Sequence, residues 1–280
     1  MKRLCLAVAA LAALIAAGCS GGGGSIPTPP PPVGGFSNAS LNGQYAFSMA
    51  GNDVNGFFFA RIGSFTADGQ GHITTGLEDV NTTSTVPGFG LPLQFANSTY
   101  TIQADGRGIV LLTNATRTLQ FSVTLISTTK GYIVETDGSG TASGTFTKQD
   151  PSAFTSAGLS GSYVFDFSGV DITNVNNVVP LSIVGQFTSN GGGVIPTGVL
   201  DVNDGATPSG VQTFLNGSYQ LDTNGNGTNF GRGTATFDGL TYAFYIVDGT
   251  HAKFLEEDTS GATVGDAMAQ TQGMERMRLL

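Results

Sequence analysis

The heptapeptide LNGQYAF at residues 41–47 returns as LSGSYVF at residues 159–165. Further matches follow at a nearly constant spacing, because residues 63–66, 76–81, 98–100 and 133–137 return as 185–188, 198–203, 217–219 and 254–258. The offset stays between 118 and 122 residues. A period of this length indicates duplication of a whole domain-sized unit rather than the short repeat of a solenoid.

Each unit carries the pattern of β-strands. Apolar residues alternate with polar ones, as in Phe121, Val123 and Leu125, and Asp-Gly or Asn-Gly pairs separate the runs, for example at residues 68–69 and 190–191. Period-two alternation indicates strands with one buried face, and these dipeptides favour hairpin turns. We predict an all-β fold of two tandem antiparallel domains with about eight strands each.

Two architectures fit this pattern. One is an up-and-down barrel of calycin-like or avidin-like shape, and the other is a sandwich with Greek-key connections. Hairpins between most neighbouring strands favour the barrel. A membrane-spanning barrel is a weaker alternative, because the strands are short and lack aromatic girdles. Tyr45 and Tyr163 share the parity of the following Phe in each unit, so we expect both rings in the cores.

The middle of the two units aligns in two ways. Residues 105–108 match either 224–227 or 230–233, and we prefer the second because it keeps the core Gly-Arg-Gly. Residues 224–229 then become an insertion in a loop, where insertions are tolerated.

The N-terminus has the features of an export signal. Lys2 and Arg3 precede an apolar run over residues 4–17, and small residues lead to Cys19. This resembles the lipobox of bacterial lipoproteins, although Ala16 stands where that family prefers Leu. The resemblance implies cleavage before Cys19 and lipidation of its thiol; ordinary secretion is the alternative. The run is shorter than the ~20 residues that span a bilayer.

A Gly/Pro-rich segment follows the expected lipidation site. Residues 20–35 read SGGGGSIPTPPPPVGG, which combines a flexible coil with a stiff spacer. We therefore predict a signal peptide at 1–18, a lipidated Cys and linker at 19–36, a first β-repeat at 37–150 and a second at 151–280. The expected location is the cell envelope, with the chain held at the outer membrane by its lipid anchor.

Composition excludes several classes of protein. Charged residues make up 11% of the 280 residues, and the formal net charge is −9. An acidic chain lacks the basic face that nucleic acid requires. The 19 Phe and 7 Tyr disfavour disorder, and loss of Cys5 with the signal leaves the folded part without a cysteine for a disulfide.

Candidate metal and catalytic groups are sparse. Residues 222–227 read DTNGNG, the first half of a calcium loop, but the twelfth position is Gly233 where a bidentate Glu is needed. His72 and His251 do not occupy equivalent positions, and no common hydrolase or phosphate-binding motif occurs. We expect no catalytic residue, no cofactor and no metal ligand, and the one site we assign is the lipidation of Cys19.

Three acidic positions recur in both units. Glu135 and Asp137 match Glu256 and Asp258, and on strand parity Glu135 shares a face with Ile133. An inward carboxylate with a raised pKa would mark a ligand site. Because Asp137 precedes Gly138, we instead expect these side chains at strand ends in solvent. Asp79 and Asp201 recur with the same ambiguity.

The combination of repeats resembles a set of uncharacterised bacterial lipoproteins, chiefly of soil acidobacteria. The shared motifs are Leu-x-Gly-x-Tyr-x-Phe, the Gly-rich residues 63–71 and Asp-Gly-Arg-Gly at residues 105–108. Those proteins carry such units behind a Gly/Pro-rich linker and have no established activity. The opening Leu-x-Gly-x-Tyr is also similar to the first strand of avidin-like and lipocalin-like barrels, which implies only a shape.

Three functions from different classes stay open. The leading one is a non-catalytic, surface-tethered envelope protein with a binding or structural role, whose partners are the membrane and an unidentified ligand or protein. The second is a carrier that holds one small ligand in each barrel, for which a roomy interior is required. The third is a hydrolase of extracellular polymers, which needs carboxylates paired across a cleft.

Overall fold

The computed structural model describes residues 34–84, 88–93, 97–173 and 177–271. The predicted signal peptide, Cys19 and the linker up to residue 33 lie outside these residues. Within the described part of the chain, no helix has the length and apolar character needed to cross a bilayer.

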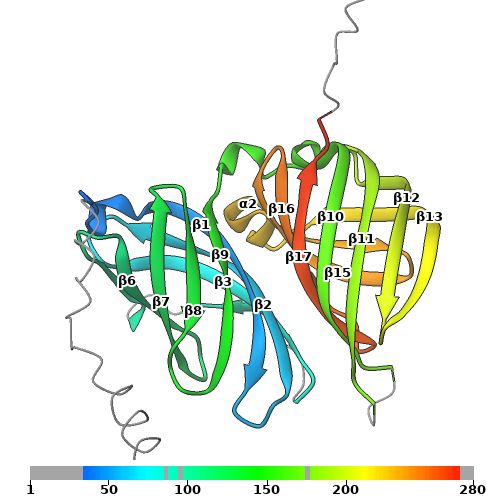
Figure 1. The fold of residues 1–280 in the computed structure, drawn as a ribbon. Coiled ribbons are helices and arrows are strands. Elements are labelled where there is room, and N and C mark those ends of the chain that lie inside the picture. The colour runs from blue at the N-terminus through cyan, green and yellow to red at the C-terminus, as the bar shows by residue number, and fades with distance from the viewer. Residues whose placement is uncertain (1–33, 85–87, 94–96, 174–176, 272–280) are drawn as a thin grey trace, which may run out of the picture. The chain divides into compact units, whose positions relative to one another are not determined.

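The first repeat forms one antiparallel sheet with the order β4-β3-β2-β1-β9-β8-β7-β6-β5 (Figure 1). Short 3-10 turns precede it at η2 (Asn38–Ser40) and follow it at η4 (Pro151–Ala153) and η5 (Ser156–Leu159). Its strands are β1 (Asn42–Asp53), β2 (Phe58–Asp68), β3 (Ile73–Thr82), β4 (Gly88–Pro92), β5 (Thr99–Ile102), β6 (Arg107–Thr113), β7 (Thr118–Ser127), β8 (Lys130–Glu135) and β9 (Gly140–Lys148).

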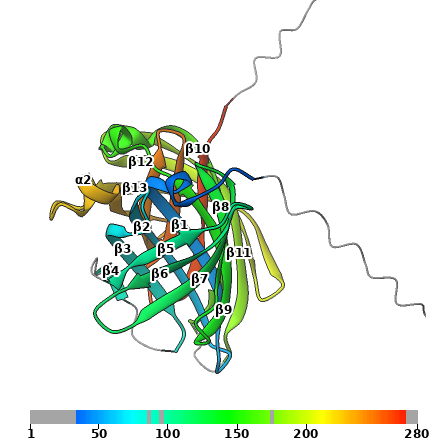
Figure 2. The same cartoon turned by 90° about the vertical axis from the view of Figure 1, so that its left-hand side faces the viewer.

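This sheet curls until its two edges approach each other at one end only (Figure 2). The backbone of Tyr100 in β5 donates to Gly71, and that of Ile73 in β3 donates to Ser98. Further along, β4 pairs with β3 instead, with Glu78 opposite Leu91. The curled sheet is therefore joined to β5 by hydrogen bonds at the start of β3, and it is open between its edge strands β4 and β5.

The second repeat forms a closed up-and-down barrel (Figure 1). Every strand pairs with its sequence neighbours, and β10 pairs with β17 to complete the ring. Its strands are β10 (Ser160–Asp171), β11 (Val179–Asn190), β12 (Val194–Asp204), β13 (Thr207–Leu221), β14 (Arg232–Phe237), β15 (Leu240–Asp248), β16 (His251–Glu256) and β17 (Gly261–Ala269). The predicted all-β class of two antiparallel units is confirmed, and the barrel alternative holds for this repeat.

The repeats differ in one strand. The second repeat has a continuous β13 of 15 residues where the first has the short β4 and β5. Pro92 ends β4, and proline has no amide hydrogen to extend the ladder. The interruption explains why the first sheet has nine strands and does not close.

Aromatic side chains fill both cores. Tyr45 and Tyr163 are fully buried, as predicted, and each stacks on a Phe of the next strand, with ring centroids 5.7 Å apart for Phe65 and 5.4 Å for Phe187. In the closed barrel the stacking continues through the rest of the interior, which contains Phe165, Phe167, Phe214, Phe237, Tyr242 and Phe254.

Strand pairing confirms the preferred alignment of the two units. Gly108 lies opposite Ile102, and Gly233 lies opposite Leu221, which matches Gly-Arg-Gly with Gly-Arg-Gly. The predicted insertion contains a short helix, α2 (Asn226–Phe230), rather than only a loop. At five residues, α2 is too short to produce a helical stripe in the sequence.

The outer faces of the two repeats share a third hydrophobic cluster. It brings Ala46, Ile62 and Leu77 of the first sheet together with Tyr245 and Leu255 of the barrel. A buried ion pair accompanies it, in which Arg232 Nη2 lies 2.7 Å from Asp79 Oδ1. Tyr245 Oη donates to Asp79 Oδ2 at 2.6 Å.

Candidate functional site

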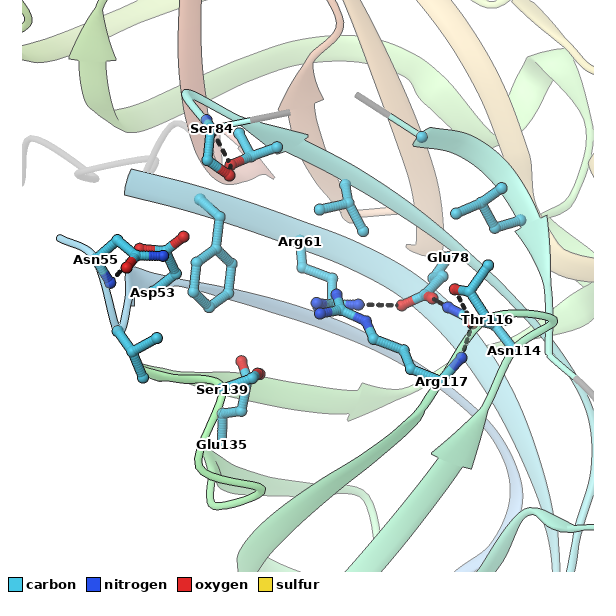
Figure 3. A pocket seen from close by; sticks show the side chains of 16 residues that line it. Asp53, Asn55, Arg61, Glu78, Ser84, Asn114, Thr116, Arg117, Glu135 and Ser139 are labelled. Atoms are coloured by element: carbon cyan, nitrogen blue, oxygen red, sulfur yellow. Dashed lines mark hydrogen bonds and ion pairs between the residues drawn. The ribbon is translucent and has the colours of Figure 1, made fainter. Parts of the chain in front are cut away.

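The interior of the first sheet opens into a cavity of about 510 Å3 (Figure 3). Its lining comes from the strand ends and connections at one end of the sheet: β1–β2, β3–β4, β6–β7 and β8–β9. The walls are Asp53, Val54, Asn55, Phe59, Arg61, Glu78, Val80, Thr82, Ser84, Gly88, Leu91, Asn114, Thr116, Arg117, Glu135 and Ser139. Polar and charged side chains thus meet inside a β-structure whose other end is aromatic.

A buried ion pair lies at the inner end of this cavity. Arg61 occupies the inward-facing row of β2 that also contains Phe59 and Phe65, and its Nη1 donates to Glu78 Oε2. The exposed fractions are 1% for Arg61 and 0% for Glu78. The guanidinium carbon also lies 5.9 Å from the ring centroid of Phe59, within the range of a cation–π contact.

Asn114 connects this ion pair to the turn after β6. Its Nδ2 donates to Glu78 Oε1 at 2.6 Å, and its Oδ1 accepts from the backbone amides of Thr116 and Arg117. An Asn side chain that bonds the backbone two residues on is the usual stabiliser of such turns. Asn114 thereby places Arg117 at the cavity wall.

Arg117 is the second cation of the cavity, and Figure 3 shows its side chain extending toward Arg61. Its side chain keeps access to solvent. Partial burial in the wall, followed by the nearby charge of Arg61, lowers the pKa of Arg117 below its ordinary value. Two guanidinium groups therefore line this cavity, and of the two only that of Arg61 is paired with Glu78.

Glu135 lies at the end of β8 and is only 4% exposed. Ser139 Oγ donates to its Oε1 at 2.9 Å, whereas its Oε2 has no hydrogen-bond partner among the described residues. Arg61 Nε is likewise buried and without a partner in the described structure. One buried donor and one buried acceptor are thus left unsatisfied on two side chains that line the same cavity.

The recurring carboxylates do not lie where the sequence analysis placed them. Glu135 and Glu256 are both buried, so the expectation of solvent-exposed strand ends was wrong for them. Each Glu is the last residue of its strand, β8 or β16, so the chain turns only after it. Glu135 shares a strand face with the buried Ile133, and Glu256 shares one with the buried Phe254, so both carboxylates point inward. Asp137 and Asp258 are half-buried beyond those strand ends. Asp79 is buried between the repeats, and Asp201 is exposed.

Burial of Glu256 makes the stability of the chain depend on pH. Desolvation raises the pKa of Glu256 to about 7, although Thr263 donates to its Oε2. A carboxyl group whose pKa is higher in the folded state favours folding when protonated. We therefore expect the free energy of unfolding to fall as the pH rises from about 4.5 to about 7, by on the order of 2–3 kcal/mol.

This loss is measured by urea melts across that pH range. Glu256→Gln should flatten the dependence, because the amide does not ionise and still accepts from Thr263. Glu257 is a second contributor of the same sign, since burial raises its pKa to about 7. A Glu256→Gln profile that coincides with the parent profile would contradict this assignment.

The second repeat lacks the ion pair of the first. Strand pairing puts Arg61 opposite Val80 and Ile183 opposite Val202, so Ile183 occupies the position of Arg61. By the same register Leu200 occupies the position of Glu78. No sequence motif predicted a role for Arg61, Glu78, Asn114 or Arg117. A charged residue in an inward-facing row, where the other copy is aliphatic, is the signal that would have found the first two.

The calcium-like stretch has a structural role in this fold. Asp222 Oδ2 accepts from Arg232 Nη1 at 2.6 Å, and α2 follows it. His72 is exposed beside Asp68, and His251 Nε2 lies 2.6 Å from Asp266 Oδ1. Across the described ranges no group of three or more His, Cys, Asp or Glu is arranged to hold a metal ion.

Comparisons with known proteins find only distant similarity. No family model and no curated protein matches the chain. A redesigned β-barrel is 17% identical, with a TM-score of 0.26, over 40% of this chain and 95% of its own. Kievitone hydratase from Nectria haematococca is 8% identical, with a TM-score of 0.30, over 88% of this chain and 94% of its own. A putative AttH protein from Nitrosomonas europaea is 8% identical, with a TM-score of 0.27, over 81% of this chain and 92% of its own.

Proposed function

We propose that this protein is a non-catalytic, lipid-anchored envelope protein whose first repeat binds a small polar ligand. The observation that carries the binding role is a pair of buried, unpartnered polar atoms, Arg61 Nε and Glu135 Oε2, on two side chains that line one cavity. A buried polar group without a partner costs about 1–3 kcal/mol, and more when it is charged. A ligand that satisfies both atoms recovers that cost on binding.

The size of the cavity supports a small molecule. Ligand pockets commonly enclose ~300–1,000 Å3, and this cavity encloses about 510 Å3. The second repeat supports a structural role instead, because stacked aromatic rings occupy its interior. This division does not favour the alternative of a carrier with one ligand in each barrel.

The polymer hydrolase is the less supported alternative. The cavity does contain carboxylates from two different strands, Glu78 of β3 and Glu135 of β8. However, both oxygens of Glu78 are engaged, one by Arg61 and one by Asn114. A carboxylate whose two oxygens are both engaged in this way has no free position for proton transfer.

A variant that copies the second repeat tests the binding role. Arg61→Ile combined with Glu78→Leu replaces the ion pair by the side chains found at the matching positions of the barrel. Thermal shift of the full chain against a panel of amino acids, organic acids and neutral sugars is the measurement. We expect at least one class to raise the melting temperature of the parent and not that of the double variant. No response in either protein, or equal responses in both, would refute the proposal.

The lipid anchor rests on the sequence alone. Changing Cys19 to alanine removes the only thiol that remains after signal cleavage. We expect the variant to stay unprocessed or to appear in the soluble envelope fraction, because alanine has no thiol to carry the lipid that holds the parent at the membrane. Membrane fractionation with detergent extraction is the measurement. A Cys19→Ala variant that partitions with membranes as the parent does would overturn the anchor.

A further inference from the structure

We propose that the ligand of this cavity is a small carboxylate that also carries a hydrogen-bond donor on the neighbouring carbon, as an amino acid or a hydroxy acid does. The inference rests on the proposed binding function and specifies the chemistry of the ligand. The two arginines hold the carboxylate, and Glu135 accepts from the donor.

The anionic end follows from the two guanidinium groups. Arg61 uses Nη1 on Glu78 and leaves its buried Nε without a partner. Arg117 extends toward the same region from the turn that Asn114 holds (Figure 3). Arginine presents its N–H groups as a planar fork that matches a carboxylate. A ligand carboxylate can accept hydrogen bonds from both arginines. It then gives Arg61 Nε the partner that this atom lacks, and it gives Arg117 a counter-charge.

The donor end follows from Glu135. Its Oε1 accepts from Ser139 Oγ, and its buried Oε2 accepts nothing within the described residues. An ionised carboxylate offers only acceptor sites, so its natural partner is an N–H or O–H group. A ligand ammonium adds charge attraction to the hydrogen bond, whereas a hydroxyl supplies the hydrogen bond alone.

Charge balance favours a ligand with no large net charge. The lining contains Arg61 and Arg117 together with three carboxylates. Glu78 and Glu135 are buried and match the two arginines, whereas Asp53 is half-buried and its Oδ1 accepts from the backbone amides of Asn55 and Phe57. A dianion or a simple cation would upset this balance in a partly desolvated space, where unpaired charge is costly. A zwitterion or a hydroxy monocarboxylate meets both unsatisfied atoms while changing the balance by one unit at most.

The remaining wall gives room for an apolar side chain. Phe59, Val80 and Leu91 line the same cavity. A cavity of about 510 Å3 lies within the ~300–1,000 Å3 of small-molecule pockets and exceeds the ~30 Å3 that one water fills. The ligand class is therefore an amino acid or hydroxy acid with a side chain of moderate size.

Calorimetric titration of the full chain tests the class with four matched probes. They are L-phenylalanine, L-phenyllactate, 3-phenylpropionate and 2-phenylethylamine, which differ only in the donor and the carboxylate. All twenty L-amino acids are screened first by thermal shift, and the strongest binder replaces L-phenylalanine together with its own three analogues. We expect the amino acid or hydroxy acid to bind at least about tenfold more tightly than the analogue without a donor. The amine without a carboxylate should not bind.

Two variants assign the two ends of the ligand. Arg117→Gln should weaken every carboxylate probe, whereas Glu135→Gln should weaken the amino acid and leave the analogue without a donor unchanged. Arg107→Gln is the matched control, because Arg107 is exposed and pairs with Asp105 away from the cavity. If the hydroxy acid binds more tightly than the amino acid, the donor of the ligand is a hydroxyl group, and the proposed ligand class still holds.

The outcomes separate the ligand class from the binding function. If only a neutral sugar or a simple cation binds, and the Arg61→Ile, Glu78→Leu double variant abolishes that binding, the class is wrong and the cavity is still a ligand site. If the four probes bind equally, or Glu135→Gln weakens them all alike, the class is also wrong. If nothing in the panel binds, both proposals fail.

Discussion

Replacing Tyr163 with alanine should lower the free energy of unfolding by about 3–5 kcal/mol, the range seen when a buried aromatic is truncated. The ring is fully buried, it stacks on Phe187 at 5.4 Å, and its Oη donates to Gly249 O at 3.1 Å. Loss of the ring leaves a void in the aromatic core of the barrel and an acceptor without its donor. This loss is a large share of the ~5–15 kcal/mol that holds a typical domain folded.

Urea melts of the full chain measure this effect, with Tyr132→Ala as the matched control. Tyr132 is a tyrosine of the first repeat with 58% of its surface exposed, so its loss should change the stability by less than about 0.5 kcal/mol. A Tyr163→Ala variant that melts with the parent would show that the ring is not a core anchor. It would then become a candidate contact for a binding partner.

The second large effect is expected at the Arg61–Glu78 ion pair. Arg61→Ile alone leaves Glu78 buried without its counter-ion, and Glu78→Leu alone does the same to Arg61. Breaking one side of a buried pair typically costs about 3–5 kcal/mol. Replacing both sides by apolar residues of similar volume is often neutral or stabilising by about 1–4 kcal/mol.

A double-mutant cycle therefore separates a structural pair from a functional one. We expect each single variant to be strongly destabilised and the double variant to be as stable as the parent, while losing the ligand. Arg107→Ala is the control for an exposed pair and should cost less than about 1 kcal/mol. If the stability loss of the double variant equals the sum of the two single losses, the two side chains act independently and the assigned ion pair is wrong.

Much of the fold could be predicted because it depends on local patterns. Alternation in runs such as Phe121, Val123 and Leu125 reports the buried face directly, and all three side chains are buried. Asp-Gly and Asn-Gly mark the hairpin connections, where Gly69 and Gly191 adopt the positive φ values that favour glycine. The closure of the second repeat and the interruption in the first depend on long-range pairing, which local patterns do not specify.

The polar interior of the first repeat could not be predicted from sequence motifs, because the polar residues that line it do not belong to any motif. Arg61 and Glu78 are 17 residues apart and meet only when β2 pairs with β3. Asn114 and Arg117 both lie in the turn after β6. Comparison of the two repeats could have revealed this ion pair, because the second repeat has Ile183 and Leu200 at the positions of Arg61 and Glu78.

Duplication also misled the interpretation of the acidic residues. Asp79 and Asp201 match in sequence, yet Asp79 binds Arg232 in the contact between the repeats and Asp201 faces solvent. Asn81 likewise donates to the backbone of Glu256 and Gly261, whereas Asn203 is exposed. Equivalent faces of two copies have different surroundings once one copy packs on the other, so a recurring residue need not have a recurring role.

The most direct test of a ligand site in the first repeat is the NMR signal of each arginine Nε–Hε group, recorded while an amino acid or hydroxy acid that binds is added. We predict that the Arg61 signal moves most and that Arg117 moves with it, because the ligand carboxylate accepts from both. The signals of Arg107, exposed beside Asp105, and Arg232, held by Asp79 between the repeats, should stay in place. Movement of Arg232 with Arg61 unchanged would place the ligand elsewhere and contradict the account.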